Sequence, residues 1–135
     1  MRRIPVPGAS RPEAAEVNQP KPLEIILHRA SHALEVAFDD GSRYRLPCEY
    51  LRVESPSAEV QGHGPGQRVL VPGKRQVNVS AIDPIGNYAV LLHFDDGHAS
   101  GIFSWATLRT LGEEYEQRWG AYLSELEARG QSRDA

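Results

Sequence analysis

The sequence predicts an α+β fold, mostly β, in which two similar hairpin units form small antiparallel or mixed sheets and a C-terminal helix packs on the sheet. The first observation is an internal repeat: Phe-Asp-Asp-Gly occurs at 38–41 and again at 94–97, each time followed by an alternating run. Each copy also ends in a Leu-Arg pair, at 51–52 and at 108–109, with one extra residue in the second copy. After about residue 105 the apolar spacing changes to three and four, which is typical of a helix.

Length and charge limit the classes to which the chain can belong. Its 135 residues suffice for one hydrophobic core of modest size. The 15 Lys and Arg against 18 Asp and Glu provide no net basic field of the kind that sequence-independent nucleic-acid binding needs. The start of the chain has no apolar run typical of a signal peptide or a membrane anchor. We therefore expect a cytoplasmic protein that binds neither nucleic acid nor membrane.

The composition divides the chain into three parts. Residues 1–20 hold prolines among small and polar residues, and we expect a disordered tail there. A single domain is expected over 21–128, followed by a flexible C-terminus at 129–135.

Period-two alternation predicts the strands of the domain, because successive side chains of a strand point to opposite faces. In the first unit, Asp40-Gly41 supplies the positive-φ position of a tight hairpin and Pro47 ends the last strand. The expected strands lie at 23–28, 34–38, 43–46, 69–71, 77–82 and 88–92.

The C-terminal region predicts one helix from about Trp105 to Arg129. A break is expected near Gly112 or Gly120, since glycine costs about 1 kcal/mol relative to alanine in a helix. The apolar stripe is interpreted as core packing against the sheet; its members are Trp105, Leu108, Leu111, Tyr115, Trp119, Tyr122 and Leu126.

Two side-chain types that often carry chemistry are interpreted as structural. The single cysteine, Cys48, lies next to Glu49 and lacks the electropositive setting of a nucleophile, and one cysteine cannot form an intrachain disulfide. The aspartates of the two Asp-Asp-Gly turns are interpreted as turn residues, because aspartate forms local hydrogen bonds there. No complete catalytic constellation is present, so we expect a protein that is not an enzyme.

The candidate functional residues lie in a long loop and at the second turn. No apolar period survives across 55–67, and long ordered loops in compact domains are frequently functional. His98 directly follows the second turn; it either pairs with Asp95 across a two-residue turn or contacts a metal or a partner. The partner-binding candidates are Arg52, Ser55, Ser57, Glu59, His63 and His98.

Several short motifs occur in a fixed order: the run 34–38, Asp40-Gly41, Leu51-Arg52, Gly-Asn-Tyr at 86–88, Phe-Asp-Asp-Gly-His at 94–98, Gly-Ile-Phe at 101–103 and Leu108-Arg109. This array resembles the gamma-butyrobetaine-hydroxylase-like N-terminal domain family, over about residues 25–111. The resemblance implies a small mixed fold dominated by strands, here in its stand-alone bacterial form. Other members of the family are fused to 2-oxoglutarate-dependent hydroxylases or to P-loop ATPases that act as iron–sulfur scaffolds.

The resemblance also bears on metal binding. In the hydroxylases, three cysteines and one histidine hold zinc, and the corresponding positions here are Ser55, Ser57, Val60 and His98. Serine hydroxyls and a valine cannot replace thiolates, so we expect no structural zinc and no cofactor. A residual zinc or iron site of His98 with His63, Glu59 or His93 is the alternative.

Two hypotheses of function follow. In the first, the protein is a non-catalytic binding or adaptor domain with a protein partner, in iron–sulfur or related metabolism as the family's fusions imply. In the second, it binds zinc or iron at a degenerate site around His98.

Overall fold

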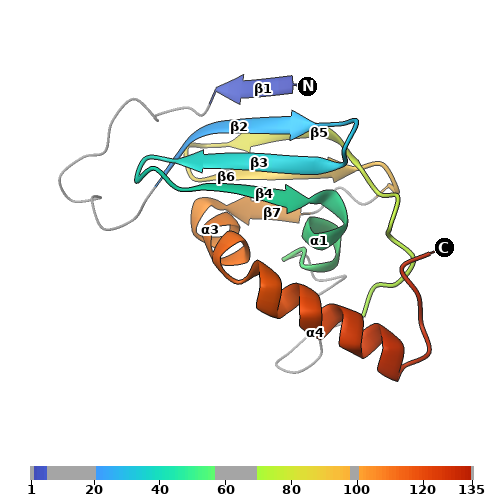
Figure 1. Ribbon diagram of the computed structural model, residues 1–135. Coiled ribbons are helices and arrows are strands. Elements are labelled where there is room, and N and C mark those ends of the chain that lie inside the picture. The colour runs from blue at the N-terminus through green and yellow to red at the C-terminus, as the bar shows by residue number, and fades with distance from the viewer. Residues whose placement is uncertain (1, 6–20, 57–69, 98–100, 135) are drawn as a thin grey trace.

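The two halves of the repeat form two antiparallel sheets that lie one behind the other, with the helices along one side (Figure 1). The computed structural model describes residues 2–5, 21–56, 70–97 and 101–134. The first sheet contains β1 (Arg2–Pro5), β2 (Pro22–His28), β3 (Ala33–Phe38) and β4 (Arg43–Pro47). The second sheet contains β5 (Val79–Ile85), β6 (Ala89–Phe94) and β7 (Gly101–Ser104). The helices are α1 (Cys48–Val53), α3 (Trp105–Glu113) and α4 (Tyr115–Ala128), and the α+β prediction is confirmed.

The repeated sequence forms the same local structure twice. Each unit runs through three strands into a helix: β2, β3, β4 and α1 in the first, β5, β6, β7 and α3 in the second. In the first unit the Asp39 N–H donates to the carbonyl of Lys21 at 2.9 Å, and the Asp39 carboxylate accepts from the Lys21 N–H at 3.1 Å. In the second unit Asp95 exchanges the same two bonds with Asn78, at 2.9 and 3.0 Å. A register shift follows at the start of β2 and of β5, so the two copies share even this irregularity.

The turns use glycine where the backbone requires it. Gly41 has φ 91° and Gly97 has φ 90°, in the left-handed region that glycine enters without strain. Phe38 donates its N–H to the carbonyl of Ser42 at 2.8 Å, so the first hairpin has a three-residue loop instead of a two-residue one. In the second hairpin the Asp95 carboxylate accepts from the Asn78 N–H, and His98 lies outside the described residues.

The core lies between the sheets and continues onto the helices. Alternating side chains of β2, β3 and β6 point inward, as the period-two pattern predicts. Trp105, Leu108 and Leu111 of α3 are buried in the same cluster, whereas Tyr122 and Leu126 of α4 form a second, smaller cluster. The α3 part of the stripe is therefore core, as interpreted, whereas Tyr122 and Leu126 pack with Val53 of α1 instead of the sheet, and Tyr115 and Trp119 are only partly buried. The largest fully buried side chains are Tyr50, Phe38, Phe103, Ile25, Leu27 and Leu34.

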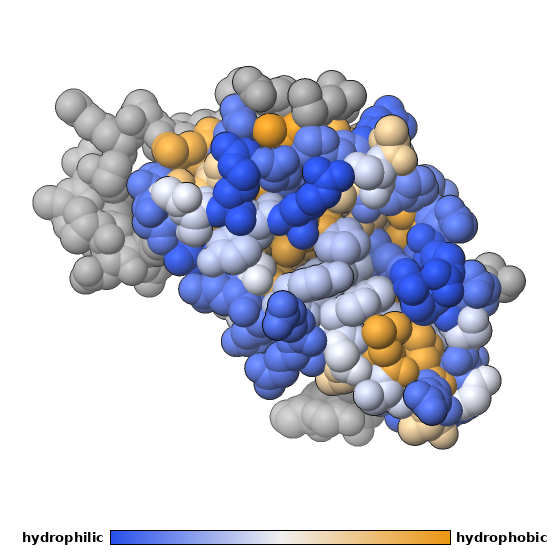
Figure 2. All heavy atoms as spheres, in the orientation of Figure 1, coloured by the Kyte–Doolittle hydropathy of each residue, from blue (hydrophilic) through white to orange (hydrophobic). Residues whose placement is uncertain are grey.

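The outer face of the first sheet is ionic. Figure 2 shows hydrophilic side chains gathered over the front of the molecule, where β3 and β4 lie. Glu35 contacts both His28, at 2.7 Å, and Arg43, and these partners hold the pKa of its carboxyl below the usual range. In the first sheet Glu35 lies opposite Arg45. At the corresponding register of the second sheet Leu91 lies opposite Ile102, and Ile102 is half exposed.

The C-terminal helix breaks near Gly112, as expected, and continues through Gly120. The break falls at Glu114, between α3 and α4. A Cβ on Gly112 would lie 2.5 Å from the ring of Tyr44, so this position is glycine because the helix rests directly on that ring. A Cβ on Gly120 would meet nothing within 4 Å.

Several elements differ from expectation. Residues 2–5 form β1 on the edge of β2, because backbone pairing needs no apolar side chains; the rest of 1–20 lies outside the described residues. Leu70 and Val71 belong to no strand, and β5 begins at Val79. The short helix α1 follows Pro47 directly, where the sequence showed only the end of a strand. No helix among the described residues is long and apolar enough to cross a membrane.

The chain end makes contacts where a flexible C-terminus was expected. The N–H groups of Gly73 and Arg75 donate to carbonyls of residues 132 and 133, each at 2.9 Å. Arg133 also binds both oxygens of the buried Glu49, at 2.7 and 2.9 Å, and stacks over Trp119. Ser132 and Arg133 therefore connect the segment 73–75 with α1 and α4.

Candidate functional site

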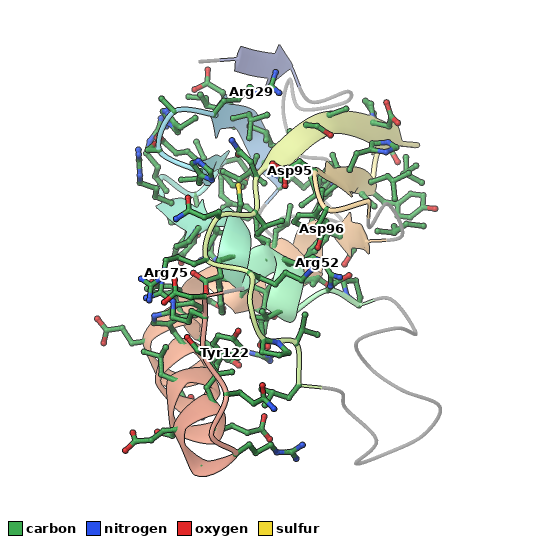
Figure 3. The ribbon with its side chains drawn as sticks, turned by 90° about the vertical axis from the view of Figure 1, so that its right-hand side faces the viewer. Arg29, Arg52, Arg75, Asp95, Asp96 and Tyr122 are labelled. Carbon is green, nitrogen blue, oxygen red and sulfur yellow. The ribbon has the colours of Figure 1, made fainter. Side chains whose placement is uncertain are left out.

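In each of the two repeats, an arginine binds an aspartate in the turn of the other repeat. Arg52 of α1, in the first unit, binds Asp96 in the turn of the second unit at 2.9 Å (Figure 3). Arg109 of α3, in the second unit, binds Asp40 in the turn of the first unit at 2.8 Å. The repeated Leu-Arg and Asp-Asp-Gly motifs are thus the two ends of a reciprocal connection between the units.

The two connections differ in burial. The Arg52 side chain is 4% exposed, and Lys74 approaches the same carboxylate oxygen of Asp96 at 2.6 Å. Arg109 is 21% exposed and binds Glu113 as well as Asp40. Hydrogen bonds from Arg109, and then from Ser42, hold the pKa of the Asp40 carboxyl well below its usual range. The second turn therefore has two cations on one carboxylate, and the first has one cation between two carboxylates.

The end of α1 is anchored in several directions at once. Arg52 contacts the second turn, Val53 packs with Tyr122 of α4, and Glu54 pairs with α4 through Arg118 at 2.9 Å. Ser55 is fully buried, and a Cβ on Gly101 would lie 3.1 Å from its hydroxyl oxygen. The chain enters the segment 57–69 from a fixed point and returns at Leu70, which packs on the same cluster as Val53.

The described members of the predicted site are buried. Arg52 and Ser55 are 3% and 0% exposed, so they hold the end of α1 in place and do not face solvent. The other four candidates, Ser57, Glu59, His63 and His98, lie outside the described residues.

Cys48 is a structural residue, as interpreted. It is fully buried, and its sulfur lies 3.5 Å from the side-chain oxygen of Asn78. Burial raises the pKa of the thiol to about 11, and the charge of Asp95 adds to the increase. A thiol of this kind is a poor nucleophile at neutral pH.

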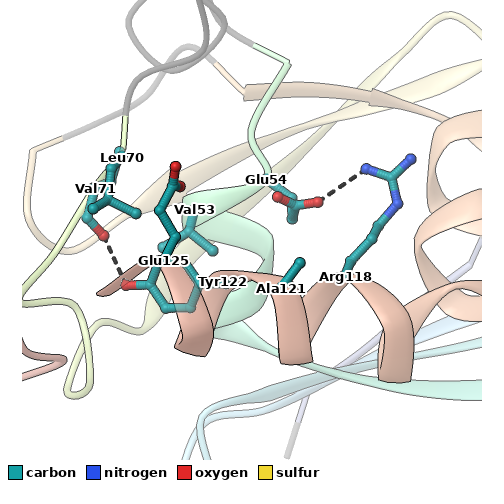
Figure 4. Close-up of a pocket in the computed structure, with 8 residues that line it drawn as sticks. All are labelled: Val53, Glu54, Leu70, Val71, Arg118, Ala121, Tyr122 and Glu125. Carbon is teal, nitrogen blue, oxygen red and sulfur yellow. Dashed lines mark hydrogen bonds and ion pairs between the residues drawn. The ribbon is translucent and has the colours of Figure 1, made fainter. Parts of the chain in front are cut away.

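A groove between α1 and α4 is a concave feature that the sequence did not reveal (Figure 4). Glu54, whose side chain is 3% exposed, pairs with Arg118 at 2.9 Å, and a cavity lies on each side of this pair. The first cavity, of about 250 Å³, has Val53, Val71 and Tyr122 among its lining residues. The second, of about 270 Å³, lies toward Thr107 and Thr110 of α3. No local sequence signal joins Glu54 to Arg118, because the two lie 64 positions apart.

Tyr122 forms part of the apolar lining of the first cavity. Its hydroxyl donates to the carbonyl of Val71 at 2.8 Å, and burial raises its pKa to about 12. The ring is held in one place by this bond and by its contact with Trp119, whose centroid is 5.2 Å away. The lining therefore combines a fixed aromatic surface with the carboxylates of Glu54 and Glu125.

The donors of the described part of the chain do not form a metal site. In these residues no three His, Cys, Asp or Glu side chains are grouped as metal ligands. Ser55 offers a buried hydroxyl at a position where the resemblance implies a cysteine ligand, and zinc sites are built from thiolate, imidazole and carboxylate donors. His93, one member of the alternative ligand set, is paired with Asp83 at 2.6 Å. The residues present here do not fit the zinc centre implied by the resemblance.

Comparison with known proteins places the chain in a family. Residues 25–109 match the model described as gamma-butyrobetaine hydroxylase-like, N-terminal, and the chain belongs to this family. No curated protein matches it.

Three solved structures are similar along most of their length. Two NMR solution structures share 48% and 47% identity, with TM-scores of 0.74 and 0.75; the matches cover 85% and 91% of this chain and 90% and 89% of those chains. A crystal structure of a protein with unknown function from Acidithiobacillus ferrooxidans, of the DUF971 family, shares 44% identity with a TM-score of 0.58. That match covers 68% of this chain and 92% of the other. The matched chains are thus covered almost completely by this one.

Proposed function

We propose that the protein is a non-catalytic binding module whose contact surface for a partner protein is the groove between α1 and α4. The observation that carries the proposal is the pair of cavities on either side of the buried Glu54–Arg118 ion pair. Binding sites are typically concave and mostly apolar, with a few fixed polar groups, and this groove has that composition. Loops held by a rigid scaffold frequently carry binding, and the segment 57–69 starts and ends beside the groove.

The rigid frame supports a binding role more than a catalytic one. Cys48 is buried, and the aspartates of both turns are engaged with backbone groups or with arginines. The polar groups at the groove include Glu54, Arg118, the Tyr122 hydroxyl and Glu125, and each has a partner within the protein. Their geometry supports recognition of another molecule.

The test is partner capture from an extract of the protein's own cells. Ala121 is exposed and lines the groove, so Ala121→Trp fills the cavity without disturbing the core. Ser124→Trp is the matched control, because Ser124 is exposed on the same helix but does not line this cavity. We expect one protein to be recovered by the wild type and the control and to be lost with Ala121→Trp. Equal recovery by all three proteins would contradict a role for the groove.

The cellular role proposed is an accessory one in iron–sulfur or related metabolism. It is supported by the composition of the family alone, since relatives of this domain are fused to iron–sulfur scaffold ATPases. Identification of the captured partner by mass spectrometry tests it, and a partner unrelated to cluster assembly or cluster-containing enzymes would contradict it.

The second candidate function is binding of zinc or iron around His98. The observation in its favour is that Ser55 lies against Gly101, so the position of the family's first cysteine is close to the strand that follows His98. Elemental analysis of protein purified without chelator distinguishes the two functions. Stoichiometric metal that is lost in His98→Ala would favour the metal site over the binding module.

A further inference from the structure

The groove between α1 and α4 has a polarity that restricts what can enter it. On one side of Glu54 lies its partner Arg118, and on the other side lie Tyr122 and Glu125 (Figure 4). The space toward Tyr122 and Glu125 therefore has carboxylates at its edge and an apolar floor. The floor is formed by Val53, Leu70, Val71, Ala121 and Tyr122.

The charges that line the cavity are unbalanced. Glu54 and Glu125 contribute two carboxylates, and Arg118 contributes the single guanidinium. Arg118 also binds Glu114 at 2.8 Å, so its charge is shared with a further carboxylate. Glu125 is 48% exposed, and its contact with Arg129 is long, at 3.5 Å. Exposed pairs of this kind are weak and exchange easily, so Glu125 is available to an incoming cation.

From these contacts we infer that the groove receives a lysine side chain of a partner protein, an inference that rests on the binding function proposed above. The aliphatic stem lies along Val53 and the ring of Tyr122, and the ammonium lies between the carboxylates of Glu54 and Glu125. Lysine suits this shape because its stem packs on apolar surface while its compact charge remains at the polar end. The Tyr122 ring adds attraction for a cation near its face.

The size of the cavity agrees with a single side chain. Its volume is about 250 Å³, at or below the lower end of the range for small-molecule sites, which starts at about 300 Å³. A single side chain that fills one pocket is the usual form of an anchor in a protein interface.

The test uses amide NMR of the full-length protein with a lysine probe. Nα-acetyl-lysine methylamide is titrated, and the uncharged Nα-acetyl-norleucine methylamide is the comparison, since it keeps the stem and removes the ammonium. We expect saturating shifts at Val53, Tyr122 and Glu125 with the lysine probe. Weak binding in the millimolar range is sufficient for this measurement.

Charge-neutral variants separate this site from general attraction to an acidic surface. Glu125→Gln keeps the shape of the groove, and we expect it to weaken binding of the lysine probe about threefold or more. Glu127→Gln removes the same charge from an exposed position of α4 outside the groove and should leave binding unchanged. Equal shifts with the norleucine probe, absent shifts, or equal loss in both variants would overturn the inference.

Failure of the lysine inference and failure of the proposed function give different results. If Ala121→Trp abolishes partner capture while the lysine probe does not bind, the binding module stands and the lysine inference fails. If the lysine probe binds at the groove while capture is unaffected by Ala121→Trp, the site exists and the proposed partner surface fails.

Discussion

The repeat supplies an internal control for the worth of a buried ion pair. Arg52 and Arg109 occupy corresponding positions and bind corresponding aspartates, but their side chains are 4% and 21% exposed. Replacement of either arginine by methionine removes the charge and keeps an unbranched apolar stem. Arg52→Met should therefore destabilise the protein more than Arg109→Met.

The magnitude follows from the geometry of the pair. At an effective dielectric constant of about 20, opposite unit charges about 4 Å apart attract by about 4 kcal/mol. Breaking a buried pair by removing one partner typically costs about 3–5 kcal/mol, because the remaining charge stays partly desolvated. Lys74, which lies 2.6 Å from Asp96, is expected to retain part of the attraction after the substitution. We expect a loss of about 2–3 kcal/mol in the free energy of unfolding for Arg52→Met.

Urea unfolding followed by tryptophan fluorescence measures both variants. A double-mutant cycle of Arg52→Met with Asp96→Asn isolates the pairwise energy from the other effects of each change. A cost for Arg109→Met equal to or greater than that for Arg52→Met would refute the argument from burial. A coupling energy near zero in the cycle would refute the role assigned to the Arg52–Asp96 contact.

Three further predictions concern glycine, the buried thiol and the chain end. Gly120→Ala should stabilise α4 by up to about 1 kcal/mol, whereas Gly112→Ala should destabilise the protein by its clash with Tyr44, as thermal unfolding of both variants can show. Folding raises the pKa of the Cys48 thiol to about 11, so its contribution to stability is complete below about pH 9 and is lost as pH rises from about 9 to about 11. Cys48→Ala should flatten that part of the pH dependence in urea unfolding, and native protein should resist thiol alkylation at pH 8. Truncation after Gln131 removes the partner of the buried Glu49 and should lower the melting temperature measured by circular dichroism.

The local structure of this protein could be predicted because its causes act over a few residues. Alternation at 34–38 and at 88–92 reflects the two faces of a strand, and Gly41 and Gly97 sit where the turns need positive φ. The short helix α1 was missed, since six residues after Pro47 carry too little periodicity to indicate a helix.

The candidate site could be predicted only in part. Arg52 and Ser55 were selected from the motif order, and both lie at the end of α1, but as buried anchors. Glu54 and Arg118 were not selected, because a charged residue in a surface-like pattern gives no sign that its partner lies on a distant helix.

By itself, the sequence determined the two-unit plan, the inward faces of the strands and the family to which the chain belongs. Only the tertiary structure showed that the arginine of each unit binds the turn of the other, and that Glu54 and Arg118 form an ion pair beside a groove. The physical reason is the sequence separation of the residues that interact. Strand pleat and turn geometry are fixed by neighbouring residues, whereas pairs such as Arg52 and Asp96, 44 positions apart, form only after the sheets have packed.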